Sequence, residues 1–156
     1  MQKRTGFTLF ELILVLGITI IFALVTLPYL FANRGKTQLD LTVKQISTLL
    51  REAQSRSISQ ASSSGWGIHF ENATTTAPFF ALFAGTYSSS SVIASYRLPG
   101  ALRYGTSTIA SGAVKEITFA QLSGTASAST SLNVFLSTDQ RASATIKIAS
   151  SGAVSY

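Results

Sequence analysis

A single carboxylate interrupts the long apolar stretch near the start of this sequence. Glu11 is the one charged residue between positions 7 and 30, and a carboxylate is costly to place in a membrane-length helix. Such a residue marks a site with a partner of opposite charge. Cleavage between Gly6 and Phe7 would create that partner, because the new amine of Phe7 would then lie one helical turn before Glu11. The pair can form within one chain or with the Phe7 amine of a neighbouring chain, which would set the register of an assembly.

The apolar stretch itself has the length of a membrane span. Residues 7–30 are about 24 positions, which as an α-helix extend about 36 Å and can cross a hydrocarbon core of about 30 Å. Lys3 and Arg4 precede it and favour a cytoplasmic N-terminus, although Arg34 and Lys36 follow it and weaken that bias. The run is longer than a cleaved secretory signal, and no A-x-A-like site follows it. An uncleaved signal anchor also fits the length, but it leaves Glu11 unexplained.

The segment KRTGFTLFELILVLGI resembles the type III (prepilin-type) signal of type IV pilins and type II secretion pseudopilins. The match includes the basic leader ending in Gly6, the aromatic Phe7, Thr8-Leu9, Glu11 as fifth residue of the mature chain and Pro28 late in the span. The resemblance implies cleavage after Gly6 by a membrane aspartyl prepilin peptidase and N-methylation of Phe7. It also implies that Glu11 forms a salt bridge with the Phe7 amine of an adjacent subunit during assembly.

One helix is predicted from about residue 8 to residue 59, interrupted or bent at Pro28 and Gly35, because proline lacks the amide hydrogen and glycine costs about 1 kcal/mol relative to alanine in a helix. Beyond the span, apolar residues recur at helical spacing and form a stripe that we expect to pack on the head's own sheet: Leu39, Val43, Ile46, Leu50 and Ala53. Four polar residues fall off this stripe: Lys44, Ser47, Arg51 and Gln54. The helix is therefore membrane-spanning in its first half and amphipathic in its second.

The rest of the chain has the pattern of short strands separated by turns. Strands are predicted at Trp66–Phe70, Phe79–Ala84, Ser95–Leu98, Arg103–Tyr104, Lys115–Ala120, Leu132–Leu136 and Thr145–Ala149. The class is α+β, a long N-terminal helix packed on a small antiparallel β head, as a meander or a small sandwich. The predicted parts are a cleaved leader (1–6), a transmembrane assembly helix (7–30), an amphipathic helix (31–60) and a β-rich head (61–156).

The head also resembles a subfamily, the GspH/FimT-type minor pilins and pseudopilins. The similar segments occur in family order: RLPGALRYG, VKEITFAQLSGTA, LNVFLST and ATIKIASSGAVSY. The resemblance implies a minor pilin or H-type pseudopilin of a type IV pilus or type II secretion filament. Its partners would be other pilin subunits, the prepilin peptidase, an inner-membrane assembly platform and membrane lipid. It implies a single-pass protein of the bacterial cytoplasmic membrane with the head outside, later part of a periplasmic or extracellular filament.

Little in the sequence suggests catalysis. There is no cysteine, and the one histidine, His69, alternates with core positions of a predicted strand, so it is expected at the surface and not as a metal ligand. No nucleophile elbow, Walker A or dinucleotide motif occurs. We therefore predict a non-enzyme with no metal and no cofactor. Asn72-Ala73-Thr74 matches the glycosylation sequon, a pattern that is common by chance.

Two alternatives remain at this stage. The first is a DNA-binding minor pilin of a DNA-uptake pilus, with weak phosphate contacts from scattered basic residues: Arg97, Arg103, Arg141 and Lys147. The C-terminal segment 151–156 has no basic residue, which departs from the basic motif of DNA-binding relatives. The second alternative is a major pilin, against which the missing cysteine pair argues.

Overall fold

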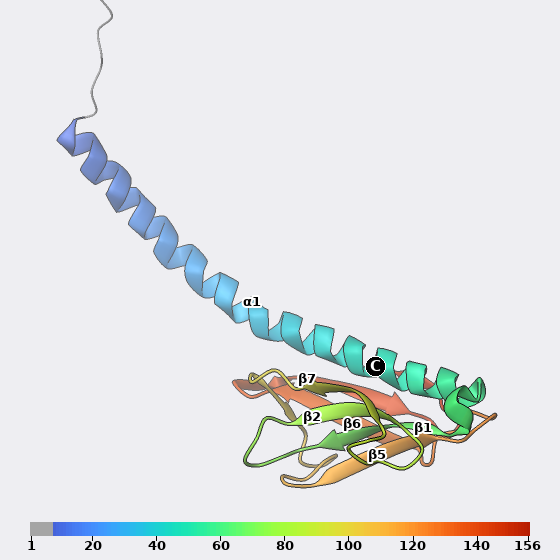
Figure 1. Cartoon of the computed structure of the whole chain (residues 1–156). Helices are drawn as coiled ribbons and strands as arrows, with labels where there is room; N and C mark the ends of the chain where they lie inside the picture. Colours follow the sequence, from blue (N-terminus) through green and yellow to red (C-terminus); the bar gives the residue numbers. More distant parts are fainter. Residues whose placement is uncertain (1–7) are drawn as a thin grey trace, which may run out of the picture. The chain divides into compact units, whose positions relative to one another are not determined.

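The computed structural model describes residues 8–156, except for the side chains of residues 27–33. One helix, α1 (Leu9–Ile58), is followed by a 3-10 turn, η1 (Ala61–Ser63), and by eight strands (Figure 1). The strands are β1 (Trp66–Glu71), β2 (Phe79–Ala84), β3 (Val92–Arg97), β4 (Leu102–Tyr104), β5 (Val114–Phe119), β6 (Thr130–Leu136), β7 (Asp139–Ile148) and β8 (Val154–Ser155). The α+β class and the long N-terminal helix are as predicted.

The chain divides into two compact units, one ending at Gly35 and one from Lys36 to Tyr156. Helix α1 runs through both units, and it is helical at Pro28 and Gly35, where an interruption was predicted. Of the two predicted alternatives, an interruption or a bend, the continuous helix excludes the interruption. A bend at Pro28 stays a prediction, because the side chains of residues 27–33, which include Pro28, are not described.

The head contains two antiparallel sheets. Sheet A has the strand order β3-β2-β1-β5, and sheet B has the order β4-β6-β7-β8. Within sheet A, β1 pairs with β2 and β5, and Trp66 lies between Ala84 and Phe119. Within sheet B, β6 and β7 form a long hairpin with an irregularity between Phe135 and Leu136. The arrangement puts β1 and β6–β7 in the middle of their sheets.

The second half of α1 covers the inner faces of both sheets. The five residues of the predicted stripe are all buried, so its packing on the head is confirmed. They share one hydrophobic core with residues of sheet A such as Ile68 and Phe70 and residues of sheet B such as Val134 and Ile146. Phe70 meets Tyr104 edge-on with ring centroids 6.1 Å apart, which joins the two sheets at the core.

Ser47 is an exception to the predicted stripe. It was placed off the apolar face, but it is buried, and its hydroxyl has no hydrogen-bond partner among the described residues. Helix α1 meets two sheets, so its buried face is wider than a single stripe. Leu49 is buried for the same reason.

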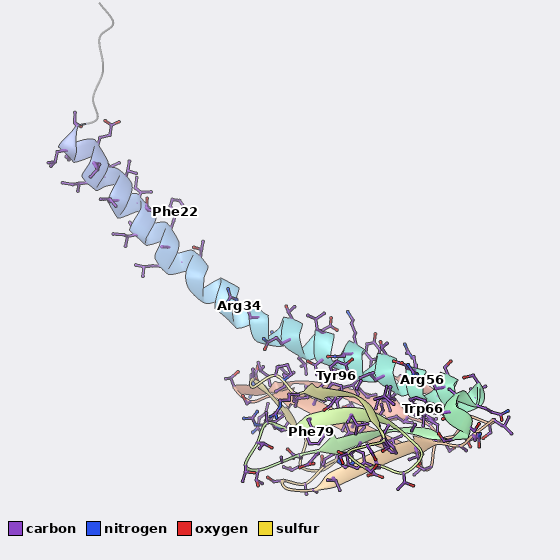
Figure 2. The ribbon with its side chains drawn as sticks, viewed as in Figure 1. Phe22, Arg34, Arg56, Trp66, Phe79 and Tyr96 are labelled. Atoms are coloured by element: carbon purple, nitrogen blue, oxygen red, sulfur yellow. The ribbon has the colours of Figure 1, made fainter. Side chains whose placement is uncertain are left out.

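Polar contacts fasten the end of α1 to the head. The Ser57 hydroxyl donates to the Phe119 carbonyl at 3.2 Å and accepts from the Trp66 amide at 2.8 Å. Arg56 lies over the Trp66 ring, 4.6 Å from its centroid, and the indole nitrogen donates to the Ala61 carbonyl (Figure 2). These contacts hold the C-terminal end of α1 against the start of β1.

Candidate assembly site

The first half of α1 offers an apolar surface on every side. Leu9–Thr26 is long and apolar enough to cross a membrane, and none of this segment is buried within the chain. Large apolar side chains such as Phe10, Ile21 and Phe22 are mostly exposed. A surface of this kind needs lipid or other helices around it.

Three polar side chains lie in this apolar segment, and two of them are satisfied by the helix itself. The Thr19 hydroxyl donates to the Val15 carbonyl at 2.7 Å, and the Thr26 hydroxyl donates to the Phe22 carbonyl at 2.8 Å. Threonine is therefore tolerated in this segment without an external partner. The third polar side chain, Glu11, differs: its carboxylate has no hydrogen bond or ion pair with any described residue.

The start of the helix explains how Glu11 is held. The Thr8 side-chain oxygen accepts a hydrogen bond from the Glu11 amide at 3.3 Å, which caps the first turn. Glu11 lies in that first turn, where the positive end of the helix dipole favours a negative charge. The backbone of Glu11 is thus fixed while its carboxylate remains available. This role of Thr8 was not predicted, although Thr-x-x-Glu is a recognisable capping pattern.

The predicted processing site lies outside the described residues. Gly6 and Phe7 both precede residue 8, so cleavage between them and methylation of Phe7 stay predictions. The same holds for the salt bridge between Glu11 and a Phe7 amine. What is described is one side of that pair, an unpartnered carboxylate at the start of an apolar helix.

The four predicted DNA contacts spread over both sheets. Arg97 ends β3 in sheet A, whereas Arg103 is on β4 and Arg141 and Lys147 are on β7 in sheet B. The Arg103 guanidinium already donates to the Gly100 and Leu102 carbonyls. Arg141 and Lys147 are six positions apart, about 20 Å along an extended strand. DNA binding stays a prediction.

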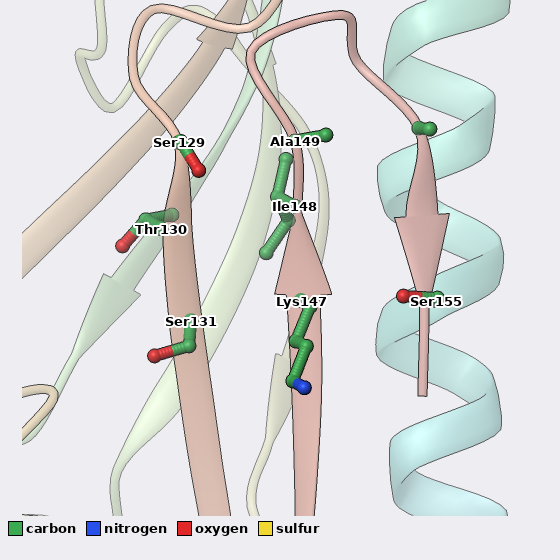
Figure 3. A pocket seen from close by; sticks show the side chains of 8 residues that line it. Ser129, Thr130, Ser131, Lys147, Ile148, Ala149 and Ser155 are labelled. Carbon is green, nitrogen blue, oxygen red and sulfur yellow. The ribbon is translucent and has the colours of Figure 1, made fainter.

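Lys147 lies in a pocket at the start of β6, the end of β7 and the short strand β8 (Figure 3). The pocket has a volume of about 490 Å³ and is lined by Ser129, Thr130, Ser131, Lys147, Ile148, Ala149, Ala153 and Ser155. In the strand register, Lys147 lies between Ser131 and Ser155. The lining therefore combines one ammonium group with hydroxyl groups and aliphatic side chains, and it contains no second charged side chain.

Two other sequence predictions in the head concern His69 and Asn72. His69 was expected at the surface, which is wrong: it is only 4% exposed, because Tyr87 stacks on it and Phe79 flanks it. Asn72 is buried too, and its side-chain amide donates to the Ile109 carbonyl at 3.0 Å. The folded head therefore does not present the Asn72 amide for glycosylation.

Comparison with known proteins adds one finding. No family model matches the chain, and no curated protein matches its sequence. The crystal structure of the type IV minor pilin FimU from Pseudomonas aeruginosa strain PAO1 matches with a TM-score of 0.55, covering 75% of this chain and 90% of that one. The chain has a type IV pilin fold. At 14% identity the likeness establishes the fold and leaves the role to be argued from the residues.

Proposed function

We propose that this chain is a non-enzymatic subunit of a type IV filament, either a minor pilin of a pilus or an H-type pseudopilin of a type II secretion filament. A pilin fold in the head and an apolar helix at the N-terminus support this proposal. Residues 7–30 would hold the precursor in the cytoplasmic membrane, with Lys3 and Arg4 on the cytoplasmic side. The same helix would then line the core of the filament.

The unpartnered carboxylate of Glu11 carries the proposal. A carboxylate within an apolar bundle is stable only when it is paired, and no described residue pairs with it. Prepilin peptidase would cut after Gly6 and release an amine at Phe7, four residues before Glu11. In a filament the Phe7 amine of one subunit then meets the Glu11 carboxylate of its neighbour, and this pairing sets the stagger between subunits. Methylation leaves the Phe7 amine able to carry its positive charge.

This proposal also names the partners of the precursor. The leader before Phe7 would be read by the prepilin peptidase, and the mature helix would be passed from lipid to an inner-membrane assembly platform. Each step uses the N-terminal segment and not the head. The head would determine which other subunits lie beside it.

Substitution of Glu11 tests the proposal. Glu11→Gln keeps the size of the side chain and removes its charge, so membrane insertion should be unchanged. Removing one partner of a buried ion pair costs about 3–5 kcal/mol, so incorporation into filaments should fall about a hundredfold or more. The measurement is the amount of the chain in sheared, purified filaments against the amount in the membrane fraction.

Glu52→Gln is the matched control. Glu52 is on the same helix and pairs with Arg56, but this pair is more than a third exposed and contributes little. Incorporation of Glu52→Gln should equal that of the unsubstituted chain. Normal incorporation of Glu11→Gln would show that the charge of Glu11 has no part in assembly.

A further inference from the structure

His69 lies on the outer face of sheet A beneath a returning loop. Residues 85–91 connect β2 to β3, and the Tyr87 ring stacks on the imidazole with centroids 3.6 Å apart and planes 4° apart. Ser91 organises the loop: its hydroxyl donates to the Thr86 carbonyl at 2.8 Å and accepts from the Ser88 amide. Tyr87 also meets Phe83 edge-on at 5.5 Å. The loop therefore covers part of the sheet that would otherwise face solvent.

The two ring nitrogens of His69 face two carboxylates. Nδ1 is 2.9 Å from Oε1 of Glu116, its direct partner across β1 and β5. An ionised carboxylate only accepts, so Nδ1 carries a hydrogen. Nε2 is buried, lies 3.8 Å from Oε2 of Glu71 and has no hydrogen-bond partner among residues 8–156. A neutral ring would direct the Nε2 lone pair at that carboxylate, whereas an imidazolium directs an N–H at it.

We propose that His69 is a proton-dependent clasp: as an imidazolium between Glu116 and Glu71 it holds Tyr87 and loop 85–91 on sheet A, and loss of the proton releases the loop. A charged ring also attracts the face of the stacked phenol more strongly than a neutral ring does. The proposal does not depend on the chain being a filament subunit.

The surroundings contain few other charges. Besides the two glutamates, the titratable group that contacts the His69 ring is Tyr87 from the loop. Strand β2 contributes Phe79 and Ala81, which have no titratable group. On β3, Arg97 is the register partner of Phe79 and is exposed. With a protonated His69 the cluster of one histidine and two glutamates has one net negative charge, and with a neutral His69 it has two. Deprotonation therefore leaves two carboxylates beside an unsatisfied ring nitrogen.

Release of the loop would change the surface of the head. Phe83 is 1% exposed and Ala81 is fully buried with the loop in place, although both lie on the same outer face as His69. Opening would uncover an apolar strip along β2. The clasp would thus present or hide this strip according to the pH of the surrounding solution.

Magnetic resonance tests the protonation directly. The chain has one histidine, so full-length protein in detergent micelles, purified without a histidine tag, gives one imidazole signal. As the pH is raised, we expect both ring nitrogens to stay protonated for as long as Tyr87 is stacked on the ring. The Tyr87 ring signals should shift with the same midpoint as the imidazole. A neutral His69 beneath a stacked Tyr87 would overturn the proposal.

Chymotrypsin cleavage after Tyr87 tests the release of the loop. We expect the rate, corrected with a reference peptide at each pH, to rise about tenfold or more as His69 deprotonates, because a charge-assisted hydrogen bond is lost. Glu71→Gln should lower the pH at which cleavage begins, and His69→Gln should be cleaved rapidly at every pH. Glu52→Gln is the control and should match the unsubstituted protein. A cleavage rate independent of pH, or of Glu71, would refute the clasp.

Discussion

Ser57 should be a main determinant of head stability, because its hydroxyl ties α1 to two strands. It is fully buried, and Ser57→Ala removes its bonds to the Trp66 amide and the Phe119 carbonyl. A buried amide without an acceptor costs about 1–3 kcal/mol, and the second lost bond adds about 0.5–1.5 kcal/mol. Alanine returns about 0.5 kcal/mol of helix propensity. The net loss is about 1–4 kcal/mol.

Ser47 provides a matched control on the same helix. Its hydroxyl is equally buried but has no partner in the described part of the chain. Ser47→Ala therefore removes an unpaired polar group and should raise the free energy of unfolding by about 0.5–2 kcal/mol. The two substitutions are chemically identical and should have opposite signs.

Urea unfolding of residues 36–156, the unit that contains the whole core, measures both effects. Trp66 is the one tryptophan and sits beside Ser57, so its fluorescence reports the transition. We expect the midpoint to fall for Ser57→Ala and to rise for Ser47→Ala at unchanged slope. Equal shifts for the two variants would show that the hydrogen bonds of Ser57 do not hold the helix to the head.

Three further predictions follow from individual residues. Gly152→Ala should unfold the head or cost several kcal/mol, because Gly152 has φ +88° and a Cβ there would collide with the backbone carbonyl of Gly124 as well as with the Gln54 side chain. Gly85→Ala, with φ +78° but open space, should cost only about 1 kcal/mol by the same urea titration. Burial raises the pKa of Tyr104, so the native head holds this proton more tightly than the unfolded chain; the contribution of Tyr104 to stability should be constant below about pH 10 and fall above it, as measured by thermal unfolding of the unsubstituted head against Tyr104→Phe. Intact-mass spectrometry of the membrane-extracted protein should show a chain that begins at methylated Phe7, and any other N-terminus would remove the prepilin interpretation.

Much of the fold could be predicted from local patterns. The helix was predicted within one residue of its observed ends, and β2 was predicted with its observed bounds, Phe79–Ala84. Apolar spacing carries both of these predictions because one buried face is enough to define the element. β7 was predicted from Thr145 and begins at Asp139, since its first residues pair with β6 although they lack large apolar side chains. That pairing is a non-local contact, which the sequence does not display.

The sites were predictable to different degrees. Glu11 was found because a charge in an apolar run is conspicuous, and its capping residue Thr8 was missed although its pattern is local. His69 was misplaced for another reason. Alternation in β1 correctly put it on the face away from Ile68, but its burial depends on Tyr87, which returns over the sheet from a serine-rich loop. Nothing near His69 in the sequence indicates that cover.

A zero-length carbodiimide cross-link in purified filaments tests the proposed assembly most directly. Filaments would be formed from a mixture of unlabelled and isotope-labelled subunits, and cross-linked peptides would be identified by mass spectrometry. We expect an amide between the Glu11 carboxylate of one subunit and the Phe7 amine of another. Some cross-linked pairs should then join an unlabelled peptide to an isotope-labelled one. Links found only within single chains, or filaments from which this chain is absent, would contradict the role proposed for Glu11.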